Sequence, residues 1–131
     1  MEKSMRTQTR KPPPPSRSGK PPVETRPLIT ADQAQQLGGL FKVLANPTRL
    51  ALLHALVRQS DLCVTEIADT IGVKTTAVSN QLQRLVDQGI LASRRNGNNI
   101  HYHIVDPCVT ELLDTGWCLA EDAAVRRGQP Q

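Results

Sequence analysis

Three cysteines, Cys63, Cys108 and Cys118, supply the most reactive side chains of the sequence. A disulfide framework uses an even and denser set of cysteines, so we expect reduced thiols that are free for metal binding or redox chemistry. Cys63 is expected to lie at the positive end of a helix as its N-cap, which makes it a possible accessory thiol. The alternative for Cys63 is a structural role as a cap or as a small buried side chain.

A second set of side chains has the chemistry to contact nucleic acid. One stretch with helical spacing presents hydroxyl groups, amide groups and a single arginine on its outward side, and such groups pair with base edges and phosphates. An outward face selected only for solubility would more often carry glutamate and lysine. Two further cations, Arg94 and Arg95, lie beside an asparagine-rich turn. The residues of the helical stretch are Thr75, Thr76, Ser79, Asn80, Gln81 and Arg84.

Capping residues and the 3.6-residue spacing of apolar side chains predict five helices around these groups. Gly72 follows the third helix at a position where a left-handed C-cap favours glycine. On the second helix, the residues expected to be buried include Leu50 and Val57. The helices are expected at about 31–45, from Pro47 onward, from near Cys63 to Gly72, at about 75–88, and from Pro107 to about 124.

Between the fourth and the last helix, the apolar pattern changes from a helical to a strand-like period. Ile90–Arg95 and Ile100–Val105 alternate in polarity, and Asn96-Gly97 between them is a strong hairpin signal. The third and fourth helices, joined through Gly72–Lys74, have the helix-turn-helix arrangement, in which the second helix lies in the major groove of DNA. The hairpin then brings the two arginines close to the phosphate backbone. We therefore predict a mainly α fold with a β-hairpin wing (α+β), a winged helix-turn-helix.

The positive charge of the chain is concentrated near its N-terminal end. Residues 1–27 hold seven basic and two acidic side chains, whereas the rest of the chain holds nine basic and ten acidic ones. The same segment holds seven of the ten prolines and few apolar residues, which predicts a disordered basic arm. The arm either keeps the protein in solution or adds sequence-independent attraction to phosphate. We expect the arm at 1–29, a DNA-binding and dimerisation domain at 30–125 and a frayed tail at 126–131.

Four short segments carry a specific combination of motifs. Phe41–Leu50 has the sequence FKVLANPTRL, Asp61–Val64 has DLCV and Ala77–Leu82 has AVSNQL. Arg95–Tyr102 covers the expected turn and part of the second strand. Together these segments resemble the ArsR/SmtB family of winged-helix repressors. The resemblance implies a homodimer that binds double-stranded operator DNA and releases it when an inducer binds, with the first and last helices forming the dimer interface.

The resemblance also implies two effector sites, and the sequence departs from both. The first family site is a Cys-Val-Cys motif, and here Thr65 replaces the second cysteine after Cys63. The second family site lies on the last helix and uses histidines where this chain has cysteines. The positions that match the second site are Asp106, Cys108, Cys118 and Glu121.

The geometry of a helix restricts how the two thiols of the last helix could act. Cys108 and Cys118 are separated by about 15 Å along one helix, so they cannot share an ion within a chain. Antiparallel pairing with the dimer mate would bring Asp106 and Cys108 toward the partner's Cys118 and the partner's Glu121. Two thiolates and two carboxylates suit a zinc- or cadmium-like divalent ion, and two thiolates also suit trivalent arsenic. The alternatives are an intersubunit disulfide and simple packing of both cysteines in the interface.

Two other classes of function stay open beside a transcriptional repressor. A winged-helix module can mediate protein or RNA contacts without binding an operator. An enzyme is not expected, because the sequence lacks a Ser/His/Asp set, a glycine-rich phosphate loop and a run of zinc ligands. No apolar run approaches the roughly 20 residues of a membrane span, and the first 30 residues contain no apolar signal-peptide core. We therefore expect no membrane partner and a cytoplasmic location.

Overall fold

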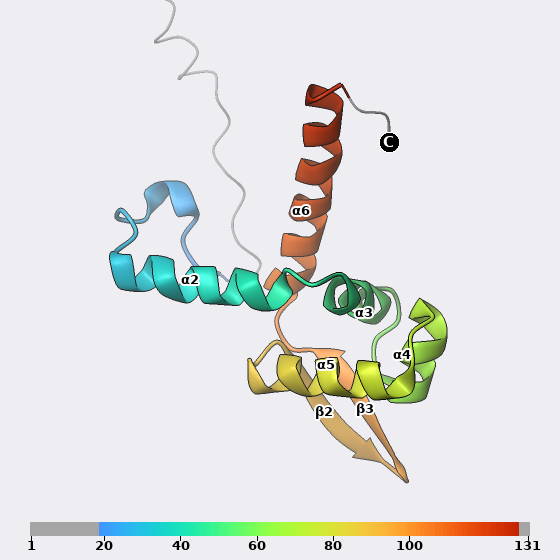
Figure 1. Ribbon diagram of the computed structural model, residues 1–131. Helices are drawn as coiled ribbons and strands as arrows, with labels where there is room; N and C mark the ends of the chain where they lie inside the picture. Colours follow the sequence, from blue (N-terminus) through green and yellow to red (C-terminus); the bar gives the residue numbers. More distant parts are fainter. Residues whose placement is uncertain (1–18, 129–131) are drawn as a thin grey trace, which may run out of the picture.

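The computed structural model describes residues 19–128, which form a helical body with a small three-stranded sheet (Figure 1). A short 3-10 helix, η1 (Val23–Thr25), comes first in this part of the chain. The predicted mainly α fold with a β-hairpin wing is confirmed. The remaining elements are α2 (Ala31–Leu44), α3 (Pro47–Arg58), β1 (Leu62–Cys63), α4 (Val64–Ile71), α5 (Thr75–Asp87), β2 (Leu91–Asn96), β3 (Asn99–Ile104) and α6 (Pro107–Arg126).

Local side chains set where the helices begin and end. Thr30 and Gln33 form a complete capping box at the start of α2. The side chains of Asn46 and Asp106 cap α3 and α6, and each is followed by a proline at the first helical position. Gly72 ends α4 in the left-handed conformation, with φ 72°. These helix starts and the end of α4 agree with the sequence prediction. They could be predicted because each depends on residues only a few positions apart.

The predicted basic arm lies mostly outside the described residues. Its described end, residues 19–29, is almost fully exposed and contains the single turn of η1. The disorder of the arm and the domain boundaries therefore stay predictions.

The sheet has the order β1-β3-β2, with both pairings antiparallel. The hairpin of β2 and β3 is confirmed. Gly97 and Asn98 form its turn, in the middle of the expected turn at 96–99, and each strand is one residue longer at that end because Asn96 pairs with Asn99. Gly97 has φ 66°, which suits a tight two-residue hairpin turn. Strand β1 was not expected, since two residues are too short to show an alternating pattern. It attaches the start of α4 to His101 and Tyr102 of β3.

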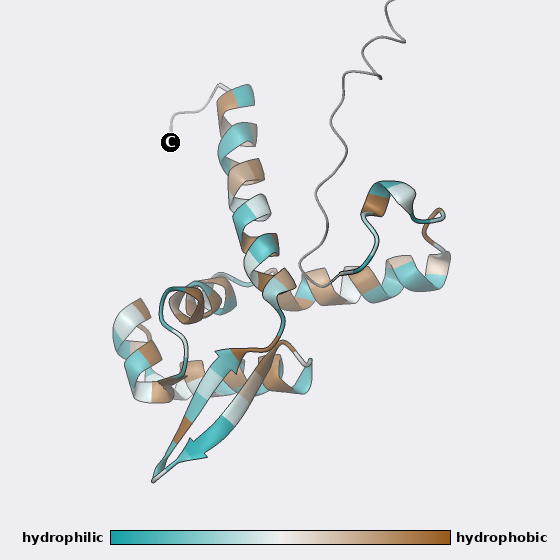
Figure 2. Ribbon diagram, turned by 180° about the vertical axis from the view of Figure 1, so that it is seen from behind, coloured by the Kyte–Doolittle hydropathy of each residue, from teal (hydrophilic) through white to brown (hydrophobic). Residues whose placement is uncertain are grey.

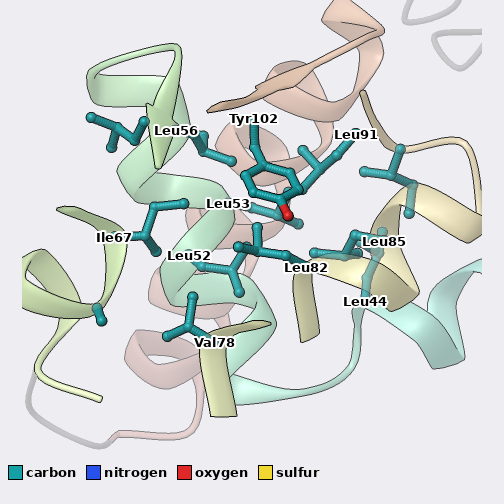
Figure 3. Packing of buried hydrophobic residues seen from close by; sticks show 13 residues of the cluster. Leu44, Leu52, Leu53, Leu56, Ile67, Val78, Leu82, Leu85, Leu91 and Tyr102 are labelled. Atoms are coloured by element: carbon teal, nitrogen blue, oxygen red, sulfur yellow. The ribbon is translucent and has the colours of Figure 1, made fainter. Parts of the chain in front are cut away.

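A leucine-rich core joins α3, α4, α5 and the sheet (Figure 3). Leu52 and Leu53 of α3 are fully buried, and Tyr102 of β3 packs in the same cluster. The expected burial of Leu50 and Val57 is wrong, because these side chains are 39% and 37% exposed. Leu50 faces a groove beside α2 and α6 and Val57 faces a shallow pocket near the hairpin, so both lie outside the core.

Two helices extend from this body. Figure 1 shows α6 projecting from the body on the side opposite the β2–β3 hairpin, while α2 extends sideways. Apolar residues recur along the lengths of both helices (Figure 2). Of the helices in residues 19–128, none is by itself long and apolar enough to cross a membrane. The pair α2 and α3 passes that test on length and composition, with a bend of 84° between them.

Candidate nucleic-acid interface and thiol sites

Helices α4 and α5 form the helix-turn-helix, and the two faces of α5 differ sharply. Val78, Leu82 and Leu85 of α5 are buried in the core. The opposite face is polar and open to solvent, which is the arrangement of a helix that enters a groove of DNA. Gln81 is half-buried at the margin between the two faces. The predicted DNA-contact residues of α5 that are exposed are Thr75, Thr76, Ser79, Asn80 and Arg84.

Gln81 is held by a residue of another helix. Its side-chain oxygen Oε1 accepts a hydrogen bond from Arg49 Nε of α3 at 2.5 Å. A second nitrogen of the same guanidinium donates to the Val43 carbonyl in the last turn of α2 at 2.8 Å. Arg49 therefore ties three helices together and restricts the orientation of the Gln81 amide. The amide NH₂ group and the second lone pair of Oε1 remain available for a further contact.

The two arginines of the hairpin lie in different surroundings. Successive residues of a strand point to opposite faces of a sheet, so Arg94 and Arg95 are on opposite faces of β2. Arg94 forms an ion pair with Asp61, the residue just before β1, and the guanidinium lowers the pKa of that carboxyl. The side chain of Arg95 is exposed and has neither a hydrogen bond nor an ion pair with any residue between 19 and 128.

Cys63 lies at the N-cap of α4 and is half-buried. Its backbone N–H donates to Glu66 Oε1 at 2.9 Å, so Glu66 takes part in the cap at the start of α4. This hydrogen bond lowers the pKa of Glu66. In the sheet, Cys63 pairs with His101 of β3. Its place as a structural cap is clear, and its role as an accessory thiol stays a prediction.

The two thiols of α6 lie far apart, because Cys108 and Cys118 are almost three helical turns from each other along the helix. Near the start, the Asp106 carboxylate accepts the backbone N–H of half-buried Cys108 at 2.9 Å, which lowers the pKa of Asp106. Just past the middle of α6, exposed Cys118 lies with its Sγ 3.7 Å from Asp122 Oδ2. The negative charge of Asp122, followed by that hydrogen bond, burial and the charge of Glu121, raises the pKa of the Cys118 thiol.

One protomer does not bring a full set of metal ligands together. Among residues 19–128, no group of three or more histidine, cysteine, aspartate or glutamate side chains is placed to hold a metal ion. The predicted ligands Asp106 and Cys108 lie at one end of α6, and Cys118 and Glu121 lie toward the other. Any site that uses both thiols therefore needs a second copy of the chain.

An apolar groove of about 640 Å³ lies between α2, α3 and α6. Phe41 of α2 and Trp117 of α6 line it, and these large side chains are 45% and 56% exposed. Trp117 meets His54 of α3 edge to face, with 5.3 Å between the ring centroids and 83° between the ring planes. This exposed apolar surface includes Trp117, the residue next to Cys118.

Sequence reasoning missed three polar residues that organise these sites. Asp61 stood out only as part of the DLCV segment, and Arg49 only as part of the FKVLANPTRL segment. Asp122, rather than Glu121, supplies the carboxylate oxygen that accepts from the Cys118 thiol. Gln81, which Arg49 holds, and Arg94, which Asp61 holds, are more than 30 residues away from these partners in the chain, so no local pattern could indicate the two pairs.

The chain is similar to known bacterial regulators in sequence and in structure. Residues 46–93 match the family model "Bacterial regulatory protein, arsR family". A transcriptional repressor SmtB homolog from Synechocystis sp. is 42% identical over 85 residues, which is 65% of this chain and 64% of that protein's length. The structure of the AntR antimony-specific transcriptional repressor superposes with a TM-score of 0.69 and 59% identity, covering 79% of this chain and 94% of the other.

A third match describes an assembly. The homodimeric winged helix-turn-helix DNA-binding domain of a possible ArsR-family transcriptional regulator from Mycobacterium bovis has a TM-score of 0.63 and 29% identity, over 74% of this chain and 89% of the other. The family model covers α3, β1, α4, α5 and the beginning of β2, and so includes the whole helix-turn-helix of α4 and α5. Given these matches and the arrangement of α4, α5 and the hairpin, the chain belongs to the ArsR family of winged helix-turn-helix transcriptional regulators.

Proposed function

We propose that the protein is a homodimeric transcriptional repressor that binds double-stranded operator DNA. The observation that carries this proposal is the exposed polar face of α5 opposite its buried face of Val78, Leu82 and Leu85. In this proposal α5 lies in the major groove, and the hairpin reaches the adjacent phosphate backbone. The DNA-contact residues are drawn from Thr75, Thr76, Ser79, Asn80, Gln81, Arg84, Arg94 and Arg95.

The dimer interface in this proposal is formed by α2 and α6. Phe41 and Trp117 expose large apolar surfaces on these helices, and the groove between α2, α3 and α6 adds to them. Apolar surface of this kind on a small protein marks an association site. The homodimeric relative from Mycobacterium bovis is consistent with the proposal.

The inducer is proposed to be a soft or borderline ion held between the subunits. Cys108 and Asp106 of one chain would meet the partner's Cys118 and the partner's Glu121, with Asp122 of each chain beside Cys118. Thiolates with carboxylates suit zinc or cadmium, and thiolates alone suit trivalent arsenic or antimony. The similarity to an antimony-specific repressor supports testing the trivalent metalloids first. An oxidant that joins the thiols in an intersubunit disulfide is the second candidate inducer.

A mobility-shift assay on reduced protein tests both parts of this proposal. We expect the full chain to bind duplex DNA from the region upstream of its own gene more tightly than an unrelated duplex or an RNA of the same length. Antimonite, arsenite, Cd²⁺ and Zn²⁺ are then added separately, and we expect at least one to release the DNA and to generate thiolate absorbance. Equal binding to all nucleic acids, or none, would favour a protein- or RNA-interaction module.

The proposed site of action is the cytoplasm, where operator DNA is found. We propose no catalytic role, because the family to which the chain belongs consists of regulators. Turnover of a substrate without DNA would contradict this part of the proposal.

A further inference from the structure

Asp61 adopts an unusual backbone conformation at the base of the wing. Its φ is 68°, and no other non-glycine residue in the described part of the chain has a positive φ. Aspartate tolerates the left-handed region better than most residues. Since Leu62 and Cys63 pair with β3 directly afterwards, this backbone turn holds Asp61 beside the hairpin.

Asp61 contacts both strands of the hairpin, at two positions that lie opposite each other in the sheet. Its carboxylate Oδ2 accepts a hydrogen bond from Arg94 Nη2 of β2. Its carbonyl oxygen lies 2.9 Å from His101 Nδ1 of β3, and because a carbonyl can only accept, Nδ1 carries the proton. Arg94 and His101 are directly opposite each other in the β2–β3 register. One residue outside the hairpin therefore fixes a cross-strand pair.

The cross-strand pair lies between the core and the tip of the wing. Tyr102 and Leu91 anchor the hairpin in the core, whereas the strands near Asn96 and Asn99 are exposed. The contacts of Asp61 are made on the face opposite Tyr102, so the hairpin is held from both sides at its midpoint.

The same geometry separates the roles of the two arginines. Arg94 is matched by the charge of Asp61, and the side chains of the pair are 50% and 36% exposed. Arg95 shares a face with Leu91 and Tyr102, the face that packs toward α5 in the core, and it extends that face beyond the core. Arg95 is therefore the cation on the same side of the wing as the helix-turn-helix.

We propose that Asp61 is a positioning residue that holds the wing at a fixed angle to α5 through Arg94 and His101, and that Arg95 rather than Arg94 is the wing's phosphate contact. This inference rests on the proposed DNA-binding function. It divides the two predicted wing contacts into one anchor and one DNA ligand.

The salt dependence of DNA binding distinguishes an anchor from a phosphate ligand. We expect Arg95→Gln to reduce the slope of log affinity against log salt by about 0.9 for each phosphate that the chain no longer neutralises. We expect Arg94→Gln to leave the slope unchanged and to weaken binding only about two- to fivefold, the range expected for an exposed ion pair that orients a segment. A reduction of the slope in Arg94→Gln equal to that in Arg95→Gln would overturn the assignment.

Two substitutions of Asp61 separate its charge from its backbone role. Asp61→Asn keeps a residue suited to positive φ and removes the charge, and Asp61→Gly removes the side chain while suiting the same φ. We expect both to weaken DNA binding without changing the salt slope, and we expect either change to have little further effect when Arg94→Gln is already present. If Asp61→Asn tightens binding and steepens the slope, Asp61 masks Arg94 from DNA and the proposal is wrong.

A measurement without DNA keeps this inference separate from the proposed function. Amide hydrogen exchange of β2 and β3 should become faster in Asp61→Gly and in Arg94→Gln. The variant with both substitutions should show the same increase as each single variant. Circular dichroism and thermal unfolding should remain close to those of the wild type, because the pair is exposed. Unchanged exchange in the hairpin would overturn the role of Asp61 even if DNA binding is confirmed. Faster exchange in a protein that binds no DNA would overturn only the proposed function.

Discussion

Single side chains decide how the helix-turn-helix and the wing are held in place. Arg49 donates to Val43 and to Gln81, and so connects the last turn of α2 with the recognition helix α5. Asp61 makes the corresponding connection for the wing, through Arg94 and His101. Both are charged or polar contacts on half-buried or exposed groups, so their contribution lies more in orientation than in stability.

The ion pair of Asp61 predicts a specific dependence on pH. The hydrogen bond from Arg94 is the largest of the effects on the carboxyl pKa and lowers it below its ordinary value of 3.8. Burial opposes this effect, and the charges of Arg94, His101 and His103 lower the pKa further. A carboxyl group whose pKa is lower in the folded than in the unfolded state stabilises the fold at pH values above its unfolded-state pKa. This stabilisation disappears as the pH falls through the folded-state pKa. The stability difference between the wild type and Asp61→Asn should therefore be constant from neutral pH to about pH 5 and should vanish in stronger acid.

Nuclear magnetic resonance of the Asp61 carboxyl carbon checks this prediction directly. We expect a titration midpoint below 3.8 in the wild type and a higher midpoint in Arg94→Gln, which keeps the fold but removes the cation. Equal midpoints in the two proteins would contradict the ion pair.

At the scale of elements, the two faces of α5 carry the functional argument. Val78, Leu82 and Leu85 fix the rotation of α5 about its own axis, because they are completely buried. That rotation turns Ser79 and Asn80 outward and leaves Gln81 at the margin, where Arg49 holds it. The packing of three apolar residues thus selects which polar residues can meet DNA.

Substitutions along α5 test this rotation. We expect Asn80→Ala and Ser79→Ala each to weaken operator binding by about 1–3 kcal/mol for each base that the side chain recognises, with less effect on nonspecific DNA. Gln83→Ala is the matched control, because Gln83 is on the same helix and its side chain donates to Asp87. Fluorescence anisotropy with operator and scrambled duplexes gives both affinities. If Gln83→Ala costs as much as Asn80→Ala, the face of α5 that reads bases has been assigned wrongly.

At the scale of the whole molecule, the long α6 and the sideways α2 leave one protomer incomplete. Phe41 and Trp117 are exposed on these helices, and the thiols at Cys108 and Cys118 have no shared site within residues 19–128. A second copy that covers the apolar surface would also bring the opposite ends of two α6 helices together. An ion bound there would fix the angle between the subunits and thus the spacing of the two α5 helices. Both helices can bind at once only if this spacing matches operator half-sites about 34–36 Å apart.

Mixed dimers test whether the two thiols act across the subunits. Cys108→Ser and Cys118→Ser homodimers should keep basal DNA binding and should no longer be released by antimonite or Cd²⁺. A heterodimer of the two variants keeps one intact site, so it should bind about half as many ions as the wild type. Ion binding should weaken the affinity of the dimer for DNA by at most about 1–3 kcal/mol. Isothermal titration of the purified heterodimer measures the stoichiometry. If it binds no ion and the Cys63→Ser homodimer is also unresponsive, the site involves Cys63 and the model across α6 is wrong.

The sequence alone was sufficient for the parts of the fold that depend on near neighbours. Thr30 with Gln33, Asn46 before a proline and Gly72 after α4 each act over a few residues, so the helix ends could be predicted. The hairpin was predicted for the same reason, from the alternation that surrounds Gly97. The exposed polar residues of α5 followed from helical spacing once its apolar face was recognised.

Only the tertiary structure decided which polar residues are paired and which apolar residues are covered. Arg94 with Asp61 and Arg49 with Gln81 join residues 33 and 32 positions apart, and such pairs depend on strand register and helix packing rather than on local pattern. Leu50 fits the apolar face of its helix in sequence, yet α3 turns it toward the groove, where one protomer cannot bury it. A pattern records that a side chain is apolar or charged, whereas its partner is fixed only when distant segments are brought together in the folded chain.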